Sequence, residues 1–410
     1  MACHDEPGML AIDICRARLL DTVPVLDTRE SVTLGEAVGR ITSDAVVAGH
    51  DVPPADNSAM DGYAIHQADL HSVKSDTALA LIGESFAGHP FSGTLQPGQC
   101  VRIMTGANVP DGASAVIMQE EVQRQDERVL LQRELKAAEN IRRRAEDIRA
   151  GDILLPAGHL LRAADIGLLA SQGIDRVLVQ RRLRIALIST GDELVPAGQP
   201  LGPGQIYDSN RAMLQAALTD AGFVVIDMGH AADDVDTLRQ RFMAADSSAD
   251  VVITSGGVSV GEADLVRQVI SDIGDIRIWK IAIKPGKPFA FGTLPNSVFF
   301  GLPGNPVSAL VTLLQLAMPA LITMQGGRWQ APLTHQAKLL APVRKKPGRA
   351  EYQRGVVTQT GGGELQVTPL SNQGSGVLTS MSKANCFILL AQEQGSVAEG
   401  EYVTIELFDR

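Results

Sequence analysis

Hydrophobic and polar positions follow a repeating strand–helix pattern between residues 181 and 328. Wholly apolar stretches such as LRIALIST and ADVVITSGG alternate with amphipathic ones such as SNRAMLQAALTDAG and DDVDTLRQRFMAAD. Strands without a polar face are typical of a parallel sheet that helices cover on both sides. The repeat therefore predicts a central, doubly wound α/β domain over residues 181–328, which ends with the long apolar helix PVSALVTLLQLAMPALITMQG.

The rest of the chain predicts three further parts. Residues 48–147 alternate short apolar stretches with turn residues, which is typical of a β-rich inserted domain. Residues 1–47 are expected to form a helical and extended N-terminal segment. Strand patterns such as RGVVTQT and EYVTIELF predict a small β domain over residues 329–410. The expected fold class is therefore multidomain α/β plus β.

Composition and charge narrow the class of protein. The 410 residues are 45% hydrophobic and 20% charged, which is typical of a globular protein with several domains. The formal net charge of -11 argues against nucleic acid as a partner, because phosphates require a basic face. The four cysteines are scattered, the N-terminus lacks a signal-peptide pattern, and no uninterrupted apolar run reaches about 18 residues. We therefore expect a cytoplasmic protein without a membrane span.

Five loops follow the predicted strands of the α/β domain. In a doubly wound sheet, ligands bind beyond the carboxyl ends of the strands, so these loops are expected to border one crevice. The loops are STGDEL (189–194), GHAADD (229–234), TSGGVSVGEAD (254–264), KPGKP (284–288) and GLPGNPVS (301–308).

The glycine-rich loop TSGGVSVGEAD is the first candidate binding element. Its glycines allow backbone N–H groups to turn toward an anion, and the helix that follows adds its positive end. The loop has neither the GK[ST] of a P-loop nor the GxGxxG of a dinucleotide site. A tight strand-to-helix turn explains the same residues equally well, and both interpretations stay open at this point.

Two other loops offer positive charge and a helix start. Lys284 and Lys287 project from a backbone that prolines keep from being helical, and we favour a binding role over a solvated loop. Asn305 suits the N-cap and Pro306 the first position of a helix whose first turn contains Ser308. An ordinary capped helix explains this second loop as well as an anion site does.

Acidic residues occupy the same expected edge, at Glu193, Asp233, Asp234 and Asp264. Carboxylates beside an anion repel it unless a cation lies between them, and Mg²⁺ binds through a few carboxylates and phosphate oxygens. The acids therefore predict a phosphorylated ligand held through Mg²⁺. The competing interpretation is that Asp233 and Asp264 only stabilise the helix starts near them.

Small polar residues cluster in DVPPADNSAMDGYAIH, residues 51–66. Asx turns explain Asp56 and Asn57 without any function, and physical chemistry alone favours that interpretation.

Seven motifs occur in order along the chain: DNSAMDGYA, RIMTGANVPDGASAVIMQE, NIRRRAEDI, STGDEL, TSGGVSVGEAD, IAIKPGKPFAFG and GLPGNPVSA. Together they resemble those of the molybdopterin molybdenumtransferases, the MoeA family that includes the E domain of gephyrin. The resemblance implies insertion of molybdate into adenylylated molybdopterin with Mg²⁺, and release of molybdenum cofactor and AMP. It implies four domains, with residues 1–47 joined in space to residues 148–180, and an elongated homodimer with each active site between subunits. Other molybdenum-cofactor biosynthesis proteins are further expected partners.

The resemblance also assigns roles to residues of this chain. Asp56 is expected to reach the cleft of the other subunit, which reverses the Asx-turn interpretation. The expected catalytic residues are Asp56, Asp264, Lys284 and Lys287, and the expected metal ligands are Glu193, Asp233 and Asp264. The expected substrate-binding residues are Thr105, Thr190, Ser255, Gly256, Gly257, Ser259, Gly261, Pro303, Asn305, Ser308, Arg349, Arg354 and Ser375.

Two other functions compete with this one. Molybdopterin adenylyltransferases share the α/β domain, but the additional domains before residue 181 and after residue 328 argue against that enzyme. A scaffold protein built on the same fold is the alternative from another class, and the intact acids and lysines disfavour it.

Overall fold

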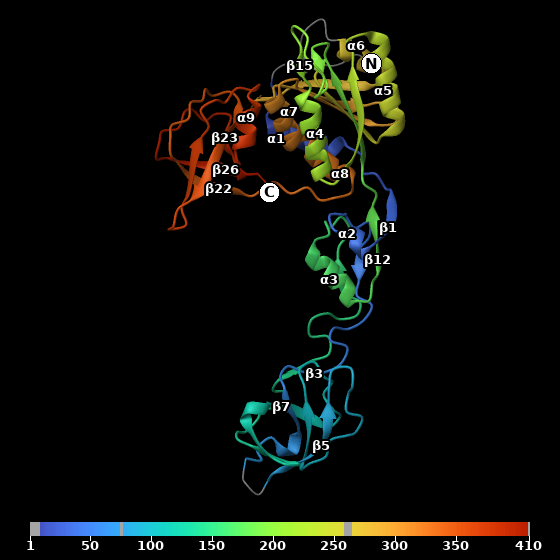
Figure 1. The fold of residues 1–410 in the computed structure, drawn as a ribbon, viewed down its shortest axis with the longest axis vertical. Helices are drawn as coiled ribbons and strands as arrows, with labels where there is room; N and C mark the ends of the chain where they lie inside the picture. The colour runs from blue at the N-terminus through green and yellow to red at the C-terminus, as the bar shows by residue number, and fades with distance from the viewer. Residues whose placement is uncertain (1–8, 74–76, 258–264, 409–410) are drawn as a thin grey trace.

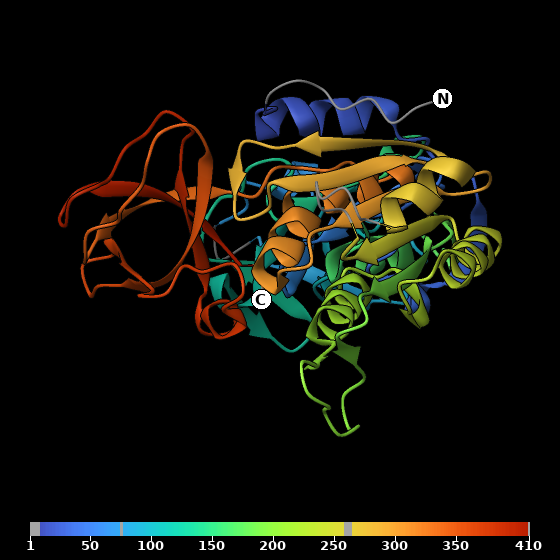
Figure 2. The same ribbon diagram turned by 90° about the horizontal axis from the view of Figure 1, so that it is seen from above.

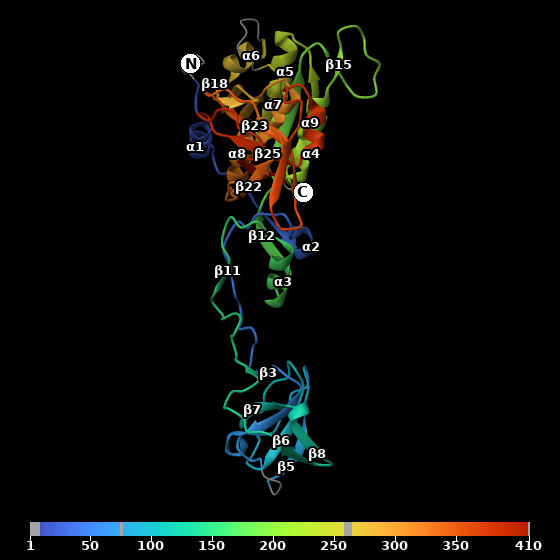
Figure 3. The ribbon, with the colours of Figure 1, turned by 90° about the vertical axis from the view of Figure 1, so that its left-hand side faces the viewer.

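The computed structural model describes residues 9–73, 77–257 and 265–408, and it is elongated (Figure 1). The α/β domain and the C-terminal β domain lie at one end, and the inserted β domain lies at the other. A narrow middle part, labelled α2, α3, β1 and β12 in Figure 1, separates the two ends, and Figure 3 shows the same separation from the side. The multidomain α/β plus β class is confirmed.

The α/β domain is built on a sheet of six strands in the order β16-β13-β17-β21-β20-β18. The first four strands run parallel, as expected. In contrast, β20 is antiparallel to both of its neighbours, since a short turn joins it to β21. The strands are β13 (Arg184–Thr190), β16 (Val224–Ala231), β17 (Val251–Ser255), β18 (Asp275–Lys280), β20 (Pro288–Thr293) and β21 (Val298–Leu302).

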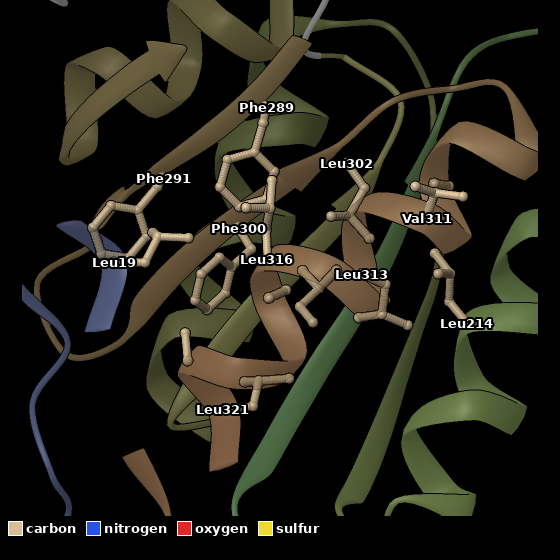
Figure 4. Close-up of a cluster of buried hydrophobic side chains, with 14 of the residues drawn as sticks. Leu19, Leu214, Phe289, Phe291, Phe300, Leu302, Val311, Leu313, Leu316 and Leu321 are labelled. Atoms are coloured by element: carbon tan, nitrogen blue, oxygen red, sulfur yellow. The ribbon is translucent and has the colours of Figure 1, made fainter. Parts of the chain in front are cut away.

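Helices cover both faces of this sheet. One face packs against α4 and the run α7–η3–α8, with α1 beside them, and Figure 4 shows Phe300, Leu316 and Leu321 in that core. The other face packs against α5 and α6. Figure 2 shows α1, in blue, along the margin of the domain. The helices are α1 (Ile12–Thr22), α4 (Ser209–Asp220), α5 (Val235–Ser248), α6 (Leu265–Ile273), α7 (Pro306–Thr312), η3 (Leu313–Ala317) and α8 (Met318–Met324).

The segment Pro306–Met324 is the expected long apolar helix, and its middle turn, η3, is π-helical. Its length and mean hydropathy of 1.9 would suffice for a membrane span, but 72% of it is buried inside the protein. The π turn contains the buried Gln315, whose Nε2 donates to Glu406 at 2.7 Å and whose Oε1 accepts from Arg16 at 3.2 Å. The segment is thus a core helix that also joins α1 to the C-terminal domain.

The middle part combines two stretches of chain that are distant in sequence. Antiparallel pairing joins β1 to β12 and β2 to β11, and Val32, Leu169 and Val179 share one small core. Residues 29–33, within the segment expected to be helical and extended, form a strand, because Val32 and Thr33 are β-branched and pair with β12. The elements are β1 (Arg29–Thr33), α2 (Leu34–Ala37), β2 (Val46–Val47), β11 (Ile153–Leu155), α3 (Ala163–Ser171) and β12 (Arg176–Gln180).

The inserted domain is a six-stranded sheet in the order β7-β4-β6-β5-β9-β8, with a small hydrophobic core on each face. The short strands β3 and β10 pair where the chain enters and leaves this domain. Its elements are β3 (Asn57–Ser58), β4 (Gly62–His66), η1 (Gln67–Asp69), β5 (Leu79–Ser85), β6 (Gln99–Ile103), β7 (Ala113–Met118), η2 (Gln119–Glu121), β8 (Val122–Gln125), β9 (Arg128–Leu131) and β10 (Ile141–Arg142).

The C-terminal domain is a small barrel, which the pairing of β23 with β25 closes. The short strand β19 leaves the α/β domain and pairs with the first residues of β23, so the two domains share a ladder. A second short pair, β14 with β15, lies at the edge of the α/β domain. The elements are β14 (Leu194–Val195), β15 (Ile206–Tyr207), β19 (Ile283–Lys284), β22 (Thr334–Leu339), β23 (Ala350–Gln359), β24 (Leu365–Pro369), α9 (Leu378–Lys383), β25 (Cys386–Leu390) and β26 (Tyr402–Leu407).

Candidate functional site

A cavity of about 980 Å³ lies where the parallel strands β13, β17 and β21 end. All five loops expected at that edge contribute to its wall, and the C-terminal barrel supplies the remaining side. The expected site residues that line it are Thr190, Glu193, Asp233, Ser255, Gly256, Gly257, Lys284, Lys287, Pro303, Asn305, Ser308, Arg349 and Ser375. Ser259, Gly261 and Asp264 lie outside the described residues.

The glycine turn forms one wall, and its backbone requires glycine. Gly256 has φ +95° and Gly257 has φ +66°. A Cβ atom on Gly257 would lie 2.4 Å from Cγ2 of Val266, in the first turn of α6. The N–H of Gly256 already donates to the carbonyl of Leu302 at 3.1 Å, which anchors the turn to β21 and takes that group from any ligand.

The start of α4 is a part of the wall that the sequence analysis missed. Asn210 Nδ2 donates to Ser255 Oγ at 2.8 Å and to the Gly304 carbonyl at 2.7 Å, so one side chain joins three loops. Asp208 caps α4 by accepting from the N–H of Arg211 at 3.1 Å. The signal in the sequence was Asp-Ser-Asn directly before an amphipathic stretch, which is a helix-start pattern. Outside the five predicted loops, the missed wall residues with polar side chains or glycine are Tyr207, Asp208, Ser209, Asn210, Gln373 and Gly374.

The two lysines of KPGKP have different surroundings. Lys284 Nζ lies 3.2 Å from Oε1 of Glu351, which is 5% exposed and also accepts from Gln353 at 2.9 Å. Lys287 is exposed, and its ammonium has no side-chain partner among residues 9–73, 77–257 and 265–408. Lys284 therefore neutralises a buried carboxylate of the barrel, whereas the charge of Lys287 is available to a ligand.

This difference predicts that only the loss of Lys284 lowers the stability of the protein. Lys284→Ala leaves the buried Glu351 carboxylate without its cation, so we expect the melting temperature to fall by about 2–4 °C, or roughly 1 kcal/mol. Adding Glu351→Gln should restore most of this loss, because the neutral amide needs no cation. Lys287→Ala is the matched control and should leave the melting temperature unchanged. Differential scanning fluorimetry of the four proteins measures this, and a double variant as unstable as Lys284→Ala would contradict the pairing.

Acidic residues also line the cavity. Glu193 and Asp233 both line the cavity, and the N–H of Asp233 donates to Asp192 Oδ1 at 3.0 Å. Asp234 instead caps α5, and hydrogen bonds from Thr237 lower the pKa of its carboxyl. Within the described parts of the chain, no group of three or more His, Cys, Asp or Glu side chains is placed to hold a metal. Two cavity-facing carboxylates nevertheless suit a Mg²⁺ ion that takes its other ligands from phosphate and water.

The barrel wall consists of Arg349, Gln373, Gly374 and Ser375. The carbonyl of Ser375 accepts from the N–H of Val307 at 3.0 Å, so the barrel loop is attached to the start of α7. Asn305 holds the expected N-cap position there, but its side chain makes no capping hydrogen bond. Arg354 does not line the cavity and is buried behind this wall.

Asp56 and Thr105 belong to the inserted domain, which lies at the opposite end of the molecule from the domains that form the cavity (Figure 3). Asp56 accepts from the N–H of Arg144 at 2.8 Å and from Arg143, and the Arg144 bond is the main cause of its lowered pKa. Thr105 donates to Asp61 through both its N–H and its hydroxyl, at 2.7 Å each. Within one chain, neither residue reaches the cavity.

Three family models match the chain in succession. Residues 10–173 match the MoeA N-terminal region (domain I and II), and residues 186–323 match a probable molybdopterin binding domain. Residues 336–408 match the MoeA C-terminal region (domain IV).

Curated proteins and solved structures are similar over the same length. The molybdopterin molybdenumtransferase of Haemophilus influenzae is 45% identical over 403 residues, which cover 98% of this chain and 99% of that protein. The molybdopterin molybdenumtransferase of a Nostoc species is 41% identical over 317 residues, or 75% of this chain and 73% of that protein. A crystal structure of the molybdopterin biosynthesis MoeA protein from Pyrococcus horikoshii is 32% identical, with a TM-score of 0.82 over 98% of this chain and 100% of that one.

Proposed function

Because the chain belongs to the MoeA family of molybdopterin molybdenumtransferases, we propose that it inserts molybdate into adenylylated molybdopterin and releases AMP and molybdenum cofactor. The observation that carries the proposal is the cavity, which combines a glycine turn, two carboxylates and the unpaired Lys287. This arrangement offers separate parts of the cavity wall to a phosphorylated ligand, a cation and an oxyanion.

Different parts of the cavity wall are proposed to bind the nucleotide-bearing substrate and molybdate. Thr190, Ser255 and the glycine turn hold the nucleotide-bearing substrate through hydroxyl and backbone groups. Lys287, with Arg349 and the hydroxyl groups of Ser308 and Ser375, receives molybdate, because ammonium and guanidinium groups bind compact oxyanions.

A Mg²⁺ ion is proposed to bind between the nucleotide-bearing substrate and molybdate. Glu193 and Asp233 are its proposed ligands, and Asp264, which follows the glycine turn in sequence, is the third. When bound, the ion would neutralise the charge on the phosphate oxygens. Glu193 and Asp233 would hold the ion, so that its charge offsets the repulsion between their carboxylates and the substrate phosphates.

The active unit is proposed to be a homodimer. Asp56 and Thr105 lie too far from the cavity of their own chain to take part in its chemistry (Figure 1). The elongated chain allows the inserted domain of a second copy to bring both residues to the cavity. Asp56 then adds a carboxylate to the cavity of the other subunit.

A cytoplasmic location is proposed from the thiols. Among the described residues, Cys15, Cys100 and Cys386 are buried and form no disulfide. Burial raises the pKa of Cys100 and of Cys386 to about 12, so both thiols stay protonated and unreactive at neutral pH.

One incubation tests the function against its alternatives. Purified protein is mixed with adenylylated molybdopterin, Mg²⁺ and either molybdate or tungstate, and AMP is measured. AMP release that requires the oxyanion supports the proposal. Release of pyrophosphate from ATP and molybdopterin would instead identify an adenylyltransferase, and no turnover in either assay would favour a scaffold.

Lys287→Ala should separate the two ligands. Loss of one charge-assisted hydrogen bond costs roughly 1.5–3 kcal/mol, so half-maximal AMP release should need about ten to a hundred times more molybdate. Affinity for AMP, measured by calorimetry without molybdate, should change less than about twofold, because the glycine turn keeps its backbone groups. Equal losses in both measurements would show that one subsite binds both ligands.

A further inference from the structure

A buried arginine lies directly behind the barrel wall of the cavity. Arg354, on β23, is 1% exposed. Its Nε donates to Ser380 Oγ at 3.0 Å, and one terminal nitrogen donates to the carbonyls of Asn372 at 3.4 Å and Gly374 at 3.2 Å. Among the described residues, no carboxylate pairs with this guanidinium, and burial lowers its pKa. A buried cation that only neutral oxygens solvate is rare, because burying unpaired charge is unfavourable.

The same residue also holds the loop through its backbone. Gln373 Oε1 accepts from the N–H of Arg354 at 2.9 Å, and Gln373 Nε2 donates to the Arg354 carbonyl at 2.9 Å. Residues 372–375 are thus fixed to one position of β23 from two sides. Three of these four residues, Gln373, Gly374 and Ser375, line the cavity.

The direction of the carbonyls has a consequence for the cavity. In a planar trans peptide, the N–H points opposite to the carbonyl of the preceding residue. Since the carbonyls of Asn372 and Gly374 point at Arg354, the N–H groups of Gln373 and Ser375 point away from it. Within the described chain, neither of these two N–H groups donates a hydrogen bond, whereas the N–H of Gly374 donates to Asn372 Oδ1 at 3.0 Å.

We propose that Arg354 is a positioning residue that turns two free N–H groups, those of Gln373 and Ser375, toward an oxyanion in the cavity. Paired backbone N–H groups of this kind are an anion-binding element. The unneutralised guanidinium behind them adds attraction for an anion without touching it. The inference rests on the proposed function, and it assigns the backbone of residues 373–375, with Lys287 and Arg349, to the molybdate subsite.

Three variants test charge and position separately. Arg354→Met removes both, Arg354→Lys keeps the charge but loses the geometry of the two carbonyl bonds, and Arg344→Met is the control. Arg344 is an exposed arginine of the same barrel, its side chain makes no described hydrogen bond, and it does not line the cavity. Two quantities are to be measured for each variant. The first is AMP release as a function of molybdate concentration, and the second is the rise in melting temperature that molybdate or tungstate alone produces.

Arg354→Met should raise the molybdate concentration for half-maximal rate about tenfold or more, the effect of losing at least one charge-assisted hydrogen bond. The rate at saturating molybdate should stay within about twofold, and Arg354→Lys should recover part of the loss because the charge remains. Arg344→Met should match the wild type. A lower saturating rate with unchanged molybdate dependence, or a lysine variant no better than methionine, would overturn the proposal.

The rise in melting temperature that the oxyanion causes still tests the proposal in two cases where AMP release cannot. If Arg354→Met does not fold, a smaller rise for Arg354→Lys than for Arg344→Met supports the proposal, and an equal rise overturns it. If the wild type releases no AMP, the proposed function fails by itself. The melting shift with molybdate alone then still decides whether Arg354 supports an oxyanion site.

Discussion

Gly257→Ala is expected to weaken AMP binding by at least tenfold. Gly257 has φ +66°, and a left-handed conformation costs an alanine about 1–2 kcal/mol. The new methyl group would also lie 2.4 Å from Cγ2 of Val266, and relief of such an overlap costs about 1–3 kcal/mol. Both Gly257 and Val266 line the cavity, so the displacement moves the wall that holds the nucleotide-bearing ligand.

Gly229→Ala is the matched control. Gly229 has φ +73° in the same domain, but a Cβ atom there would meet nothing within 4 Å. Both variants therefore carry the backbone cost, and only Gly257→Ala carries the collision. Calorimetry with AMP and a melting curve for each protein compare them. Equal AMP affinity in the two variants would show that the turn does not form the nucleotide wall.

The sequence predicted the α/β domain well because its signal is local. Strands β13, β17 and β21 are buried almost throughout, and such apolar runs bounded by loops are typical of a covered parallel sheet. The loops of the cavity followed from the same rule, since ligands bind at the carboxyl ends of these strands. The antiparallel direction of β20 could not be predicted from the sequence, because an apolar run such as Pro288–Thr293 is compatible with either strand direction.

Contacts between residues that are far apart along the chain could not be predicted from the sequence. Lys284 and Lys287 have the same local pattern, and only Glu351, 67 positions after Lys284, makes them different. Arg349 and Arg354 stand in one motif, yet the first lines the cavity and the second is buried behind it. The boundary of β23 decides this, since Arg349 lies in the bend just before the strand, whereas Arg354 lies within it.

Mixing two inactive variants should restore activity if each site is shared between subunits. Within one chain, Asp56 lies in the inserted domain and Lys287 lines the cavity at the other end (Figure 1). In a heterodimer of Asp56→Asn and Lys287→Ala chains, a shared arrangement leaves one site wild type and makes the other doubly substituted. Heterodimers isolated through two different affinity tags should therefore show about half of the wild-type rate of AMP release, at molybdate below saturation.

The reciprocal heterodimer gives the opposite result. A wild-type chain paired with an Asp56→Asn/Lys287→Ala chain has one substitution in each shared site, so it should be nearly inactive. If each chain instead uses its own Asp56, this pair keeps about half of the activity and the first pair has almost none. Asp56→Asn is chosen because the amide oxygen still accepts from the N–H of Arg144, which preserves the turn while it removes the charge. Failure to isolate any heterodimer would contradict the dimer itself, since the inserted domain would then have no second cavity to reach.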